Sequence, residues 1–413
     1  MSIYIYTVVF LILAFAGYRR VCYYTNWSLY RQGLGQYFPN NTDPHLCTHI
    51  IFSFAKLVKG ELAFYAEEDK DLYKEINNLK LFNPSLKTLI AVGGWNQEST
   101  EWSAMVSKTN KMNKFIVKSM SFLRKHEFDG VDLDWEYPAL RSGANATTDK
   151  HNFGLLCKKL RLAYEREARV TGKPRLLVTV AVAAAKKIID VSYEVPTIAR
   201  YVDFINLMSY DMHGSWLTYT GHHSQLFAKG FNSNNPEELY LDIDWAARYW
   251  VLLGAPRELI NIGLSFYGRG FTLKDPDSNG IGAQSKGPNR PGPFTRESGY
   301  MAYYEICMLL TRGGETYRDT GEPYYINGNQ WIGYDDEQSI ANKVAWLIRE
   351  GFGGAMMWAL PLDDFNQECS LSSRKFPLAN RVRDDLLAAE KLANKESSPT
   401  TTDNQWSILG DIF

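Results

Sequence analysis

The sequence lacks an excess of charge of either sign, since 45 Lys and Arg stand against 46 Asp and Glu and leave a net charge of -1. We therefore expect no basic surface for nucleic acid and no nucleic-acid partner. After residue 16 the chain also lacks any apolar run of the roughly 20 residues that a bilayer-spanning helix needs, so no membrane contact is predicted for the folded part. With 45% hydrophobic and 22% charged residues, the composition excludes wholesale disorder, collagen and a polytopic membrane protein.

Aromatic side chains, in contrast, are abundant. The 11 Trp, 25 Tyr and 21 Phe amount to 14% of the chain, which is more than a core alone needs. Flat rings on a surface suit ligands that also present flat apolar faces, and sugars are among these. The 413 residues are enough to bury a large core, either as one big domain or as a few smaller ones.

The N-terminal segment is a short apolar run that ends in Ala14-Phe15-Ala16, the small-x-small pattern of a signal-peptidase site. We predict that residues 1–16 are a cleaved secretory signal and that the mature protein is secreted and extracellular. The alternative is an N-terminal membrane anchor, because no Lys or Arg precedes the run. The run is, however, shorter than a spanning helix requires.

Secretion would lead the cysteines to pair, and five cysteines leave one over. Cys157 falls on an apolar helical face with Phe153 and Leu160, so we predict that it is the buried, unpaired thiol. Three pairings stay open for the other four, which are Cys22, Cys47, Cys307 and Cys369. Proximity along the chain favours pairing the first two with each other and the last two with each other.

Three N-x-[ST] sequons are present. Asn40 and Asn145 begin two of them in polar stretches and are predicted glycan sites. Asn26 begins the third inside an apolar, strand-like run, and we predict that it is unmodified.

Short β-branched or aromatic runs alternate along the chain with longer amphipathic ones, which is the pattern of repeated βα units around a parallel sheet. The predicted strands are Val21–Thr25, His49–Ala55, Thr88–Gly93, Gly130–Trp135, Leu177–Val182, Phe204–Tyr210, Asn261–Tyr267 and Ala355–Leu360. Eight such units predict an α/β fold, a (β/α)8 TIM barrel over residues 17–388, with catalytic side chains where the strands end. A doubly wound sheet is the alternative, but no glycine-rich phosphate turn follows the first strand.

Two regions break this rhythm. Residues 275–334, between the seventh and eighth strands, are rich in Gly, Pro and Tyr and are too long for a loop, so we predict a small inserted α+β subdomain. Residues 389–413 are polar and without periodicity, which predicts a disordered tail. Because no cysteine follows Cys369, no disulfide-rich carbohydrate-binding module is expected there.

The fourth predicted strand concentrates acidic residues on one face. Side chains alternate in a strand, so Asp132, Asp134 and Glu136 share the face that points into a barrel, opposite Val131 and Leu133. Three carboxyls on a buried face repel one another, so at least one should hold a proton, which is the state that acid catalysis uses. Glu136, the last of the three, would lie at the mouth of the barrel.

A structural network of buried carboxylates and a site for a hard cation are the alternatives. Later strands supply no matching His or carboxylate cluster, so no metal is predicted. Buried charge this dense has little rationale in stability, which favours a catalytic role.

The segment from Asp129 to Glu136, DGVDLDWE, resembles the DGxDxDxE signature of glycoside hydrolase family 18, the chitinases. Residues 18 to 385 resemble the secreted animal members of that family. The resemblance implies a (β/α)8 barrel with an α+β insertion after the seventh strand, and no cofactor is predicted. It also implies two disulfides, Cys22–Cys47 and Cys307–Cys369.

The resemblance carries roles over to individual residues. Glu136 would be the general acid, Asp134 would orient the acetamido group of the substrate, and Asp132 would share a proton behind it. The M-x-Y-D motif at the end of the sixth strand is also present. Within it, Tyr210 would donate to the acetamido carbonyl and Asp211 would bind the sugar near the cleavage point.

Further positions match residues that line the cleft in the family. They are Tyr23, Trp27, Trp95, Tyr137, Met208, Trp216, Tyr267, Arg269 and Trp358. Tyr267 and Arg269 would bind neighbouring sugars, and Trp358 would lie beneath the sugar whose bond breaks. Each aromatic could instead belong to the core, and for Tyr23 the two interpretations are equal.

Hydrolysis of a glycoside needs an acid and usually a second carboxylate across the sugar. Here Asp134 lies two residues from Glu136 on the same strand, so no second carboxylate is well placed. The resemblance implies that the N-acetyl oxygen of the substrate attacks instead. The predicted reaction is retaining endo-hydrolysis of β-1,4-linked N-acetylglucosamine in chitin and chitooligosaccharides, and we expect a monomer.

Two other functions are compatible with the fold. The family contains chitin-binding lectins that have lost the acidic Glu, but Glu136 is present here and favours an enzyme. An enzyme that cleaves N-glycan cores is disfavoured by the chitinase-type insertion.

Overall fold

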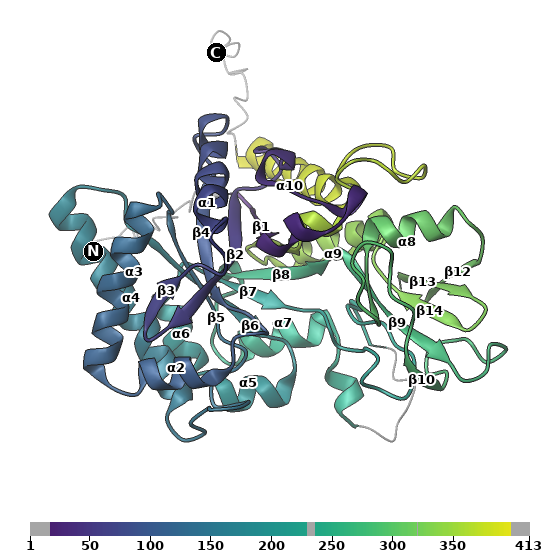
Figure 1. Ribbon diagram of the computed structural model, residues 1–413, viewed down its shortest axis with the longest axis horizontal. Helices are drawn as coiled ribbons and strands as arrows, with labels where there is room; N and C mark the ends of the chain where they lie inside the picture. The colour runs from purple at the N-terminus through teal and green to yellow at the C-terminus, as the bar shows by residue number, and fades with distance from the viewer. Residues whose placement is uncertain (1–16, 229–235, 320, 398–413) are drawn as a thin grey trace, which may run out of the picture.

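A closed barrel of parallel strands forms the centre of the protein (Figure 1). The computed structural model describes residues 17–228, 236–319 and 321–397. Within these residues eight parallel strands pair in a ring, which closes because β1 pairs with both β15 and β2. The strands are β1 (Arg19–Thr25), β2 (His49–Val58), β4 (Lys87–Gly93), β5 (Gly130–Asp134), β6 (Leu177–Ala183), β7 (Phe204–Met208), β8 (Ile260–Ser265) and β15 (Gly354–Trp358). The predicted (β/α)8 barrel is confirmed, and each of the eight predicted strands overlaps one of these.

Helices cover the outside of the barrel (Figure 1). They are α1 (Asp69–Asn78), α2 (Ser99–Val106), α3 (Thr109–Lys125), α4 (Asp149–Thr171), α5 (Lys186–Ser192), α6 (Val195–Tyr201), α7 (Ile243–Leu252), α9 (Glu337–Glu350) and α10 (Pro377–Ser397). In α3 the buried side chains recur at helical spacing, as Met112, Phe115, Ile116, Ser119 and Leu123. This apolar stripe faces the barrel and leaves the charged residues of the helix in water.

Local signals set where these helices begin and end. The carboxylate of Asp336 caps α9 by accepting the backbone N–H of Ser339. Gly351, at φ 74°, ends the same helix in the left-handed conformation, which glycine adopts without a steric penalty.

The insertion between β8 and β15 is a second sheet with one helix packed on it (Figure 1, green). In the described part of the insertion, the strand order is β10-β9-β14-β13-β12, and β11 also pairs with β9. The elements are β9 (Tyr267–Leu273), β10 (Ser285–Pro288), β11 (Tyr300–Ala302), α8 (Tyr303–Leu310), β12 (Glu315–Asp319), β13 (Glu322–Asn327) and β14 (Gln330–Gly333). A small apolar core that includes Phe271, Ile326 and Trp331 holds the sheet together. The short β3 (Glu61–Ala63) extends the barrel sheet at β2.

The insertion begins earlier than the predicted boundary at residue 275. β8 ends at Ser265 and β9 starts at Tyr267, so the predicted seventh strand runs across the junction of barrel and insertion. Both strands are apolar and they follow each other directly. Composition changes only later, where Gly and Pro become frequent, and the predicted boundary follows that change.

The predicted tail also begins too early. Helix α10 continues to Ser397, eight residues past Ala389. Its last turns are tied to the start of the barrel, because the carboxylate of Glu390 accepts the backbone N–H of Tyr18 at 2.7 Å. Residues 398–413 and the predicted signal, residues 1–16, lie outside the described residues.

All five cysteines lie in the described residues. Disulfides join Cys22 to Cys47 and Cys307 to Cys369, which confirms the favoured pairing. Cys157 is the free cysteine, and it is buried in α4 as predicted. Asn26, at the sequon that we predict to be unmodified, is buried and donates to Asp69 at 2.8 Å. No helix in the described ranges is long and apolar enough to cross a bilayer.

The cysteine arrangement predicts a simple thiol count. A thiol reagent at pH 8 should find no reactive group in the native protein and one after denaturation, because burial raises the pKa of Cys157 to about 12 and keeps the reagent out. A Cys157→Ala variant should give no thiol in either state. Three or five thiols in denatured, unreduced protein would contradict the pairing.

Candidate active site

The acidic face of β5 points into the barrel. Asp132 and Asp134 are buried in this strand, and Glu136 follows just beyond its end, half-buried. Tyr23 identifies the inward direction, because it lies on β1, which does not pair with β5, and donates to Asp132. Thr179 on the adjacent strand β6 also donates to Asp132. The site therefore opens at the carboxyl ends of the strands, where (β/α)8 enzymes place their chemistry.

Asp132 is the best-satisfied of the three carboxyls. Tyr23 Oη donates to Oδ2 at 2.7 Å, Thr179 Oγ1 donates to Oδ1 at 2.5 Å, and Asn206 Nδ2 lies 3.4 Å from Oδ1. Burial raises the pKa of Asp132 to about 6, although these hydrogen bonds act in the opposite direction.

Asp134 is the least satisfied. Its Oδ1 is buried and has no hydrogen-bond partner among the described residues. Burial raises the pKa of Asp134 well above its ordinary value, and the negative charges of Glu136 and Asp132 raise it further. A buried carboxyl oxygen without a partner is costly unless a ligand supplies a donor.

Glu136 stands at the mouth of the barrel with a pKa of about 7. Burial is the main cause of this rise and the charge of Asp211 adds to it, while Tyr137 and Arg141 act against it. At near-neutral pH the carboxyl is therefore partly protonated and can donate a proton. All three carboxyls thus have raised pKa values, mainly through burial, and repulsion within the acidic face contributes at Asp134.

Asp211, which follows β7, has the opposite electrostatic setting. Arg269 on β9 binds both of its oxygens, through Nε and Nη2 at 2.7 Å each, and Tyr267 Oη donates to Oδ1 at 2.7 Å. Burial alone would raise the pKa of Asp211, but the Arg269 guanidinium outweighs it and holds that pKa well below its usual range. Asp211 is therefore a permanent negative charge beside Glu136.

The other predicted residues of the M-x-Y-D motif lie beside these carboxyls. Tyr210 is half-buried, its ring is 6.0 Å from that of Tyr267, and its Oη approaches Met356 Sδ at 3.8 Å. Burial raises the pKa of Tyr210, and the next cause is the charge of Asp134, which places the phenol near that carboxyl. Met208 is the last residue of β7, and its partly buried side chain packs against the core.

An aromatic surface extends from Trp358, at the end of β15. Its ring lies 5.2 Å from Tyr23 and 6.2 Å from Trp27, and Trp27 is 41% exposed. Phe54 on β2, which the sequence does not single out, stacks 6.0 Å from both Trp27 and Trp358. Tyr23 itself is only 1% exposed, so it belongs to the core and supports Asp132 rather than lining an open cleft.

Two more predicted tryptophans are exposed. Trp95 is 61% exposed and Trp216 is 56% exposed. The Arg141 guanidinium lies 4.1 Å from the ring centre of Trp95, and that of Arg269 lies 5.3 Å from the ring centre of Trp216. Each cation holds a large ring at the surface.

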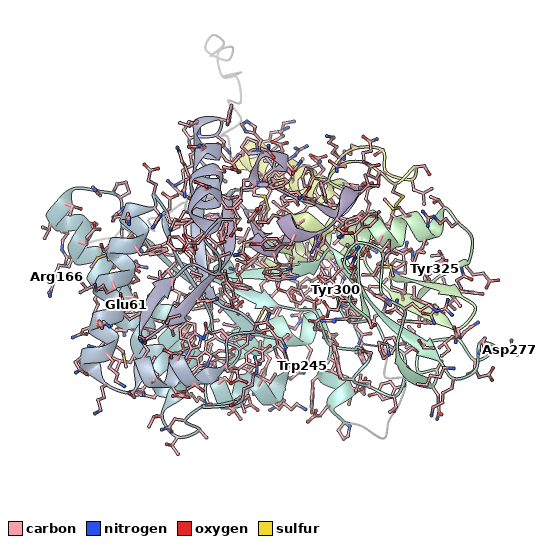
Figure 2. All side chains as sticks on the ribbon, viewed as in Figure 1. Glu61, Arg166, Trp245, Asp277, Tyr300 and Tyr325 are labelled. Carbon is pink, nitrogen blue, oxygen red and sulfur yellow. A yellow bond between two sulfur atoms is a disulfide. The ribbon has the colours of Figure 1, made fainter. Side chains whose placement is uncertain are left out.

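Some contributing residues were missed by sequence reasoning. Arg141 donates to the carbonyl oxygens of Trp95 and Glu136 at 2.7 and 3.0 Å, and so fixes the backbone of the predicted acid. Tyr300 stacks on Tyr267 at 4.6 Å, and Figure 2 shows it where the insertion meets the barrel. Thr179 and Asn206 carried a usable signal, since each is a polar residue inside an otherwise apolar strand.

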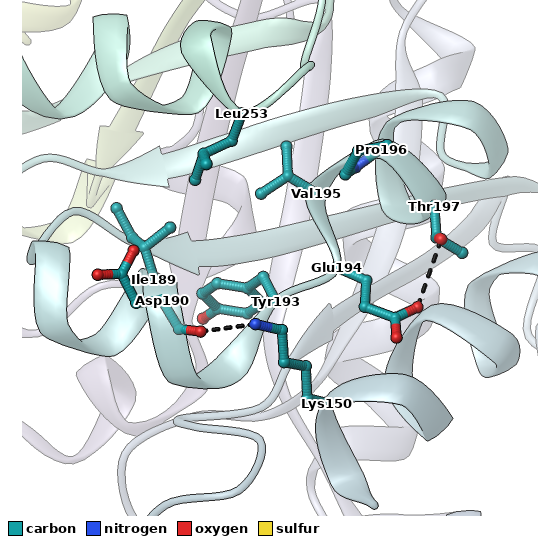
Figure 3. A pocket seen from close by; sticks show the side chains of 9 residues that line it. All are labelled: Lys150, Ile189, Asp190, Tyr193, Glu194, Val195, Pro196, Thr197 and Leu253. Carbon is teal, nitrogen blue, oxygen red and sulfur yellow. Dashed lines mark hydrogen bonds between the residues drawn. The ribbon is translucent and has the colours of Figure 1, made fainter.

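A cavity of about 530 Å³ on another part of the surface lacks this chemistry. It is lined mainly by residues of α4, α5 and α6, and Figure 3 shows Lys150, Asp190 and Glu194 as its charged side chains. Lys150 donates there to the Asp190 carbonyl at 2.6 Å, and Thr197 donates to Glu194 at 3.4 Å. The lining residues include no buried carboxyl pair, so the group of carboxyls around Glu136 is the candidate active site. In the described ranges no group of three or more His, Cys, Asp or Glu side chains could hold a metal ion.

Comparison with known proteins points to one family. Residues 19–363 match the family model described as Glycosyl hydrolases family 18. Chitotriosidase-1 of Mus musculus is 42% identical over 366 residues, covering 89% of this chain and 77% of that protein. The structure of an immunomodulatory active chitinase from Trichuris suis has a TM-score of 0.85 and 38% identity, covering 89% of this chain and 100% of that one. Human YKL-39, a pseudo-chitinase with retained chitooligosaccharide binding, has a TM-score of 0.84 and 39% identity, covering 89% and 99%.

The raised pKa of Glu136 predicts a pH-dependent cost to stability. The folded state holds this proton up to about pH 7, whereas the unfolded chain releases it near pH 4.3. The free energy of unfolding therefore falls, through Glu136, as pH rises from about 4.3 to about 7. The difference in Tm between Glu136→Gln and the wild type, variant minus wild type, should therefore be a few degrees higher at pH 8 than at pH 4.5.

Thermal unfolding at the two pH values measures this difference. Glu98→Gln is the matched control, because Glu98 is exposed and water solvates its carboxylate in both states. If the Tm of Glu136→Gln minus that of the wild type is equal at both pH values, or is higher at pH 4.5, the folded protein does not hold the Glu136 carboxyl protonated.

Proposed function

The chain belongs to glycosyl hydrolases family 18, and from this membership and the geometry of the cleft we propose that it is a chitinase. The proposed reaction is retaining endo-hydrolysis of β-1,4-linked N-acetylglucosamine in chitin and chitooligosaccharides. The observation that carries the proposal is the placement of Glu136, with a pKa of about 7, at the mouth of the barrel beside the buried Asp134.

Glu136 is the proposed general acid. Cleavage of a glycosidic bond requires a proton on the leaving oxygen, and a carboxyl with a pKa near the working pH transfers it well. After the leaving group departs, the carboxylate can take a proton from the attacking water. Arg141 supports this role by holding the Glu136 backbone through its carbonyl oxygen.

The proposed nucleophile is the acetamido oxygen of the substrate. Most glycosidases place a second carboxylate across the sugar, but Asp134 ends β5 and Glu136 follows only two residues later. Family 18 is an established exception in which the substrate itself assists. The unpartnered Oδ1 of Asp134 would accept the acetamido N–H, and Tyr210 would donate to the acetamido carbonyl.

Asp132 completes the proposed catalytic group from below. Tyr23 and Thr179 hold it in the barrel interior, where its raised pKa of about 6 allows it to share a proton with Asp134. A shared proton lets Asp134 change its charge as positive charge develops on the oxazolinium-like intermediate.

The rings around the carboxyls are the proposed sugar-binding surface. Trp358 would lie beneath the sugar whose bond breaks, and Trp27 extends the same surface. Trp95 and Trp216 would pack against sugars on either side, with Tyr137 beside the acid. Asp211, held by Tyr267 and Arg269, would bind a sugar hydroxyl near the cleavage point.

A chitin-binding lectin of the same fold is the second candidate. YKL-39 is a pseudo-chitinase that retains chitooligosaccharide binding, so the fold and cleft alone do not distinguish the two functions. The intact Glu136 with its raised pKa favours the enzyme, because burial of this carboxyl destabilises its ionised form and sugar binding alone does not require a proton donor.

We also propose that the protein is secreted. Two disulfides within a barrel of this size are typical of an oxidising compartment, and the N-terminal apolar run supports a cleaved signal. Asn145, in an exposed sequon, is the favoured glycan site, because the Thr42 of the Asn40 sequon is buried.

Replacement of the acid should separate turnover from binding. Glu136→Gln keeps the size of the side chain but cannot donate its proton as a carboxylic acid does, so kcat on a soluble chitin oligomer should fall by about 10²–10⁴-fold. The oligomer should still bind, as measured by isothermal titration calorimetry. Glu98→Gln on the nearby surface should leave both quantities unchanged. A Glu136→Gln enzyme with near wild-type kcat would show that another group is the acid.

The need for an acetamido group gives a second test. Fully deacetylated chitosan and cellulose should be inert, because neither offers an N-acetyl oxygen. Partly acetylated chitosan should be cut only where an acetylated unit lies on the non-reducing side of the broken bond, and the new end should appear first as the β-anomer. Product sequencing with NMR of the anomers measures both.

Asp134→Asn provides the matched variant for this test. It should slow cleavage of acetylated substrates far more than Asp129→Asn does, because Asp129 lies at the other end of the strand, where it pairs with Lys80 at 2.7 Å. Deacetylated units at the new reducing ends, or α-anomers formed first, would exclude substrate assistance.

A further inference from the structure

A line of buried polar groups runs from helix α9, through the junction of barrel and insertion, to Asp211. At its far end Lys343 on α9 is fully buried and forms an ion pair with Asp335. Ser265, the last residue of β8, donates to Asp335 Oδ2 at 3.0 Å, and Ser265 Oγ lies 3.4 Å from His223 Nε2. The other side of His223 faces Asp211.

His223 contacts Tyr267 and Asp211, two of the residues predicted to bind sugar. Its Nε2 lies 3.1 Å from the Tyr267 carbonyl oxygen, so that nitrogen carries a hydrogen and donates it. Its Nδ1 lies 3.5 Å from the Asp211 backbone nitrogen, which donates to it, and 3.7 Å from Asp211 Oδ1. The His223 carbonyl also accepts the N–H of Met212 at 2.9 Å, so the two segments lie side by side.

The Asp211 backbone needs this support. Its φ of 58° is in the left-handed region, which non-glycine residues adopt rarely and which persists where surrounding contacts hold it. Arg269 and Tyr267 occupy the two oxygens of the Asp211 carboxylate, but they leave its backbone N–H unbound. His223 is the group that meets this N–H.

The direction of the hydrogen bonds favours a neutral imidazole. Lys343 and Ser339 donate to Asp335, which keeps it ionised and ready to accept from Ser265. Ser265 can then accept from His223 Nε2–H, which leaves Nδ1 as the acceptor. A proton on Nδ1 would face Asp211 Oδ1 at 3.7 Å, but it would set two N–H groups against each other at the closer Asp211 backbone nitrogen, 3.5 Å away.

Charges face His223 from several elements. They are Asp211 after β7, Arg269 on β9 and Asp335 before α9, and the neighbouring His222 and Lys343 lie behind them. Burial is the largest influence and lowers the pKa of His223, although the two aspartates act in the opposite direction. The neutral form suggested by the hydrogen bonds therefore agrees with the electrostatics.

We propose that His223 is a positioning residue that holds the Asp211 turn and the Tyr267 backbone in the arrangement that binds sugar. It acts as a neutral imidazole whose tautomer is set by the Tyr267 carbonyl and by the buried Ser265–Asp335–Lys343 line. The inference rests on the proposed function, because it concerns the same cleft. It adds that buried groups after β7, at the end of β8 and on α9 support sugar binding from behind the exposed ones.

Three variants, each made in the Glu136→Gln background, test the proposal by calorimetric binding of chitohexaose. His223→Leu removes both ring nitrogens and should weaken binding about tenfold, the loss expected for one hydrogen bond that orients a charged group. His223→Asn keeps an amide oxygen where Nδ1 stands and should stay within about threefold of the parent. His222→Leu removes the adjacent buried histidine, whose ring packs on Tyr324 and Trp331 instead, and should leave binding unchanged.

A pH series separates positioning from an ion pair. If His223 is neutral, the parent and His223→Asn should bind with the same pH dependence between about pH 5.5 and 7.5, where an ordinary histidine titrates. Equal affinities of the parent and His223→Leu would overturn the proposal, and so would equal losses in His222→Leu and His223→Leu, since these would reflect general destabilisation. The proposal would also be overturned if His223→Asn lost as much affinity as His223→Leu and the affinity of the parent fell as pH rises. These two results together would show that His223 is charged.

The series remains informative if the chitinase proposal fails. A wild-type protein that binds chitohexaose without cleaving it would refute the enzyme and leave the His223 comparison intact. A wild-type protein that cleaves the oligomer while His223→Leu binds normally would refute the positioning role alone.

Discussion

The burial of acidic side chains inside the barrel is the constraint on which the site depends. An ionised carboxylate removed from water costs several kcal/mol unless donors or charges compensate it. The barrel supplies these donors to Asp132 from the adjacent strand β6 as Thr179, from the next strand β7 as Asn206, and from β1, which does not pair with β5, as Tyr23. Polar residues in three otherwise apolar strands thus have a single cause. Tyr23 can reach this carboxyl because the sheet is closed, and the Oδ1 of Asp134 remains buried without a partner among the described residues.

The insertion contributes charge of the opposite kind. β9 follows β8 after a single residue, so Tyr267 and Arg269 are carried directly to the rim of the barrel. There they hold Asp211 ionised, while burial keeps Glu136 partly protonated at neutral pH. Two carboxyls in one cleft thereby receive different protonation states from their surroundings, which is how proteins separate acid from electrostatic roles. The buried Lys343 and Asp335 attach the sheet of the insertion to the barrel at the same junction.

Much of this arrangement could be predicted from the sequence, for identifiable reasons. Alternation within one strand places Asp132, Asp134 and Glu136 on a common face. The signature around them consists of consecutive residues, so both the face and the signature can be recognised without knowledge of the fold. Phe54, Arg141 and His223 could not be found in this way, because their importance arises from contacts between distant segments: His223 meets Tyr267, 44 residues away in sequence. The predicted boundaries of the insertion and of the tail were wrong because composition and structure change at different points of the chain. β9 continues the apolar character of β8, and α10 continues through polar residues because Glu390 bonds to Tyr18.

The position of the charges also explains why Glu136, among the three carboxyls of the acidic face, is suited to give up a proton. Asp132 is surrounded by donors that favour its ionised form, and Asp134 lies between two other carboxyls, so its proton is strongly retained. Glu136 alone stands at the mouth, where Arg141 and Tyr137 partly offset its burial and keep its pKa near neutrality. Asp211 raises that pKa again, and Asp211 is held by residues of the insertion and by His223. The protonation of the proposed acid therefore depends on both parts of the protein, and a change in the insertion that displaced Asp211 would alter the acid without touching it.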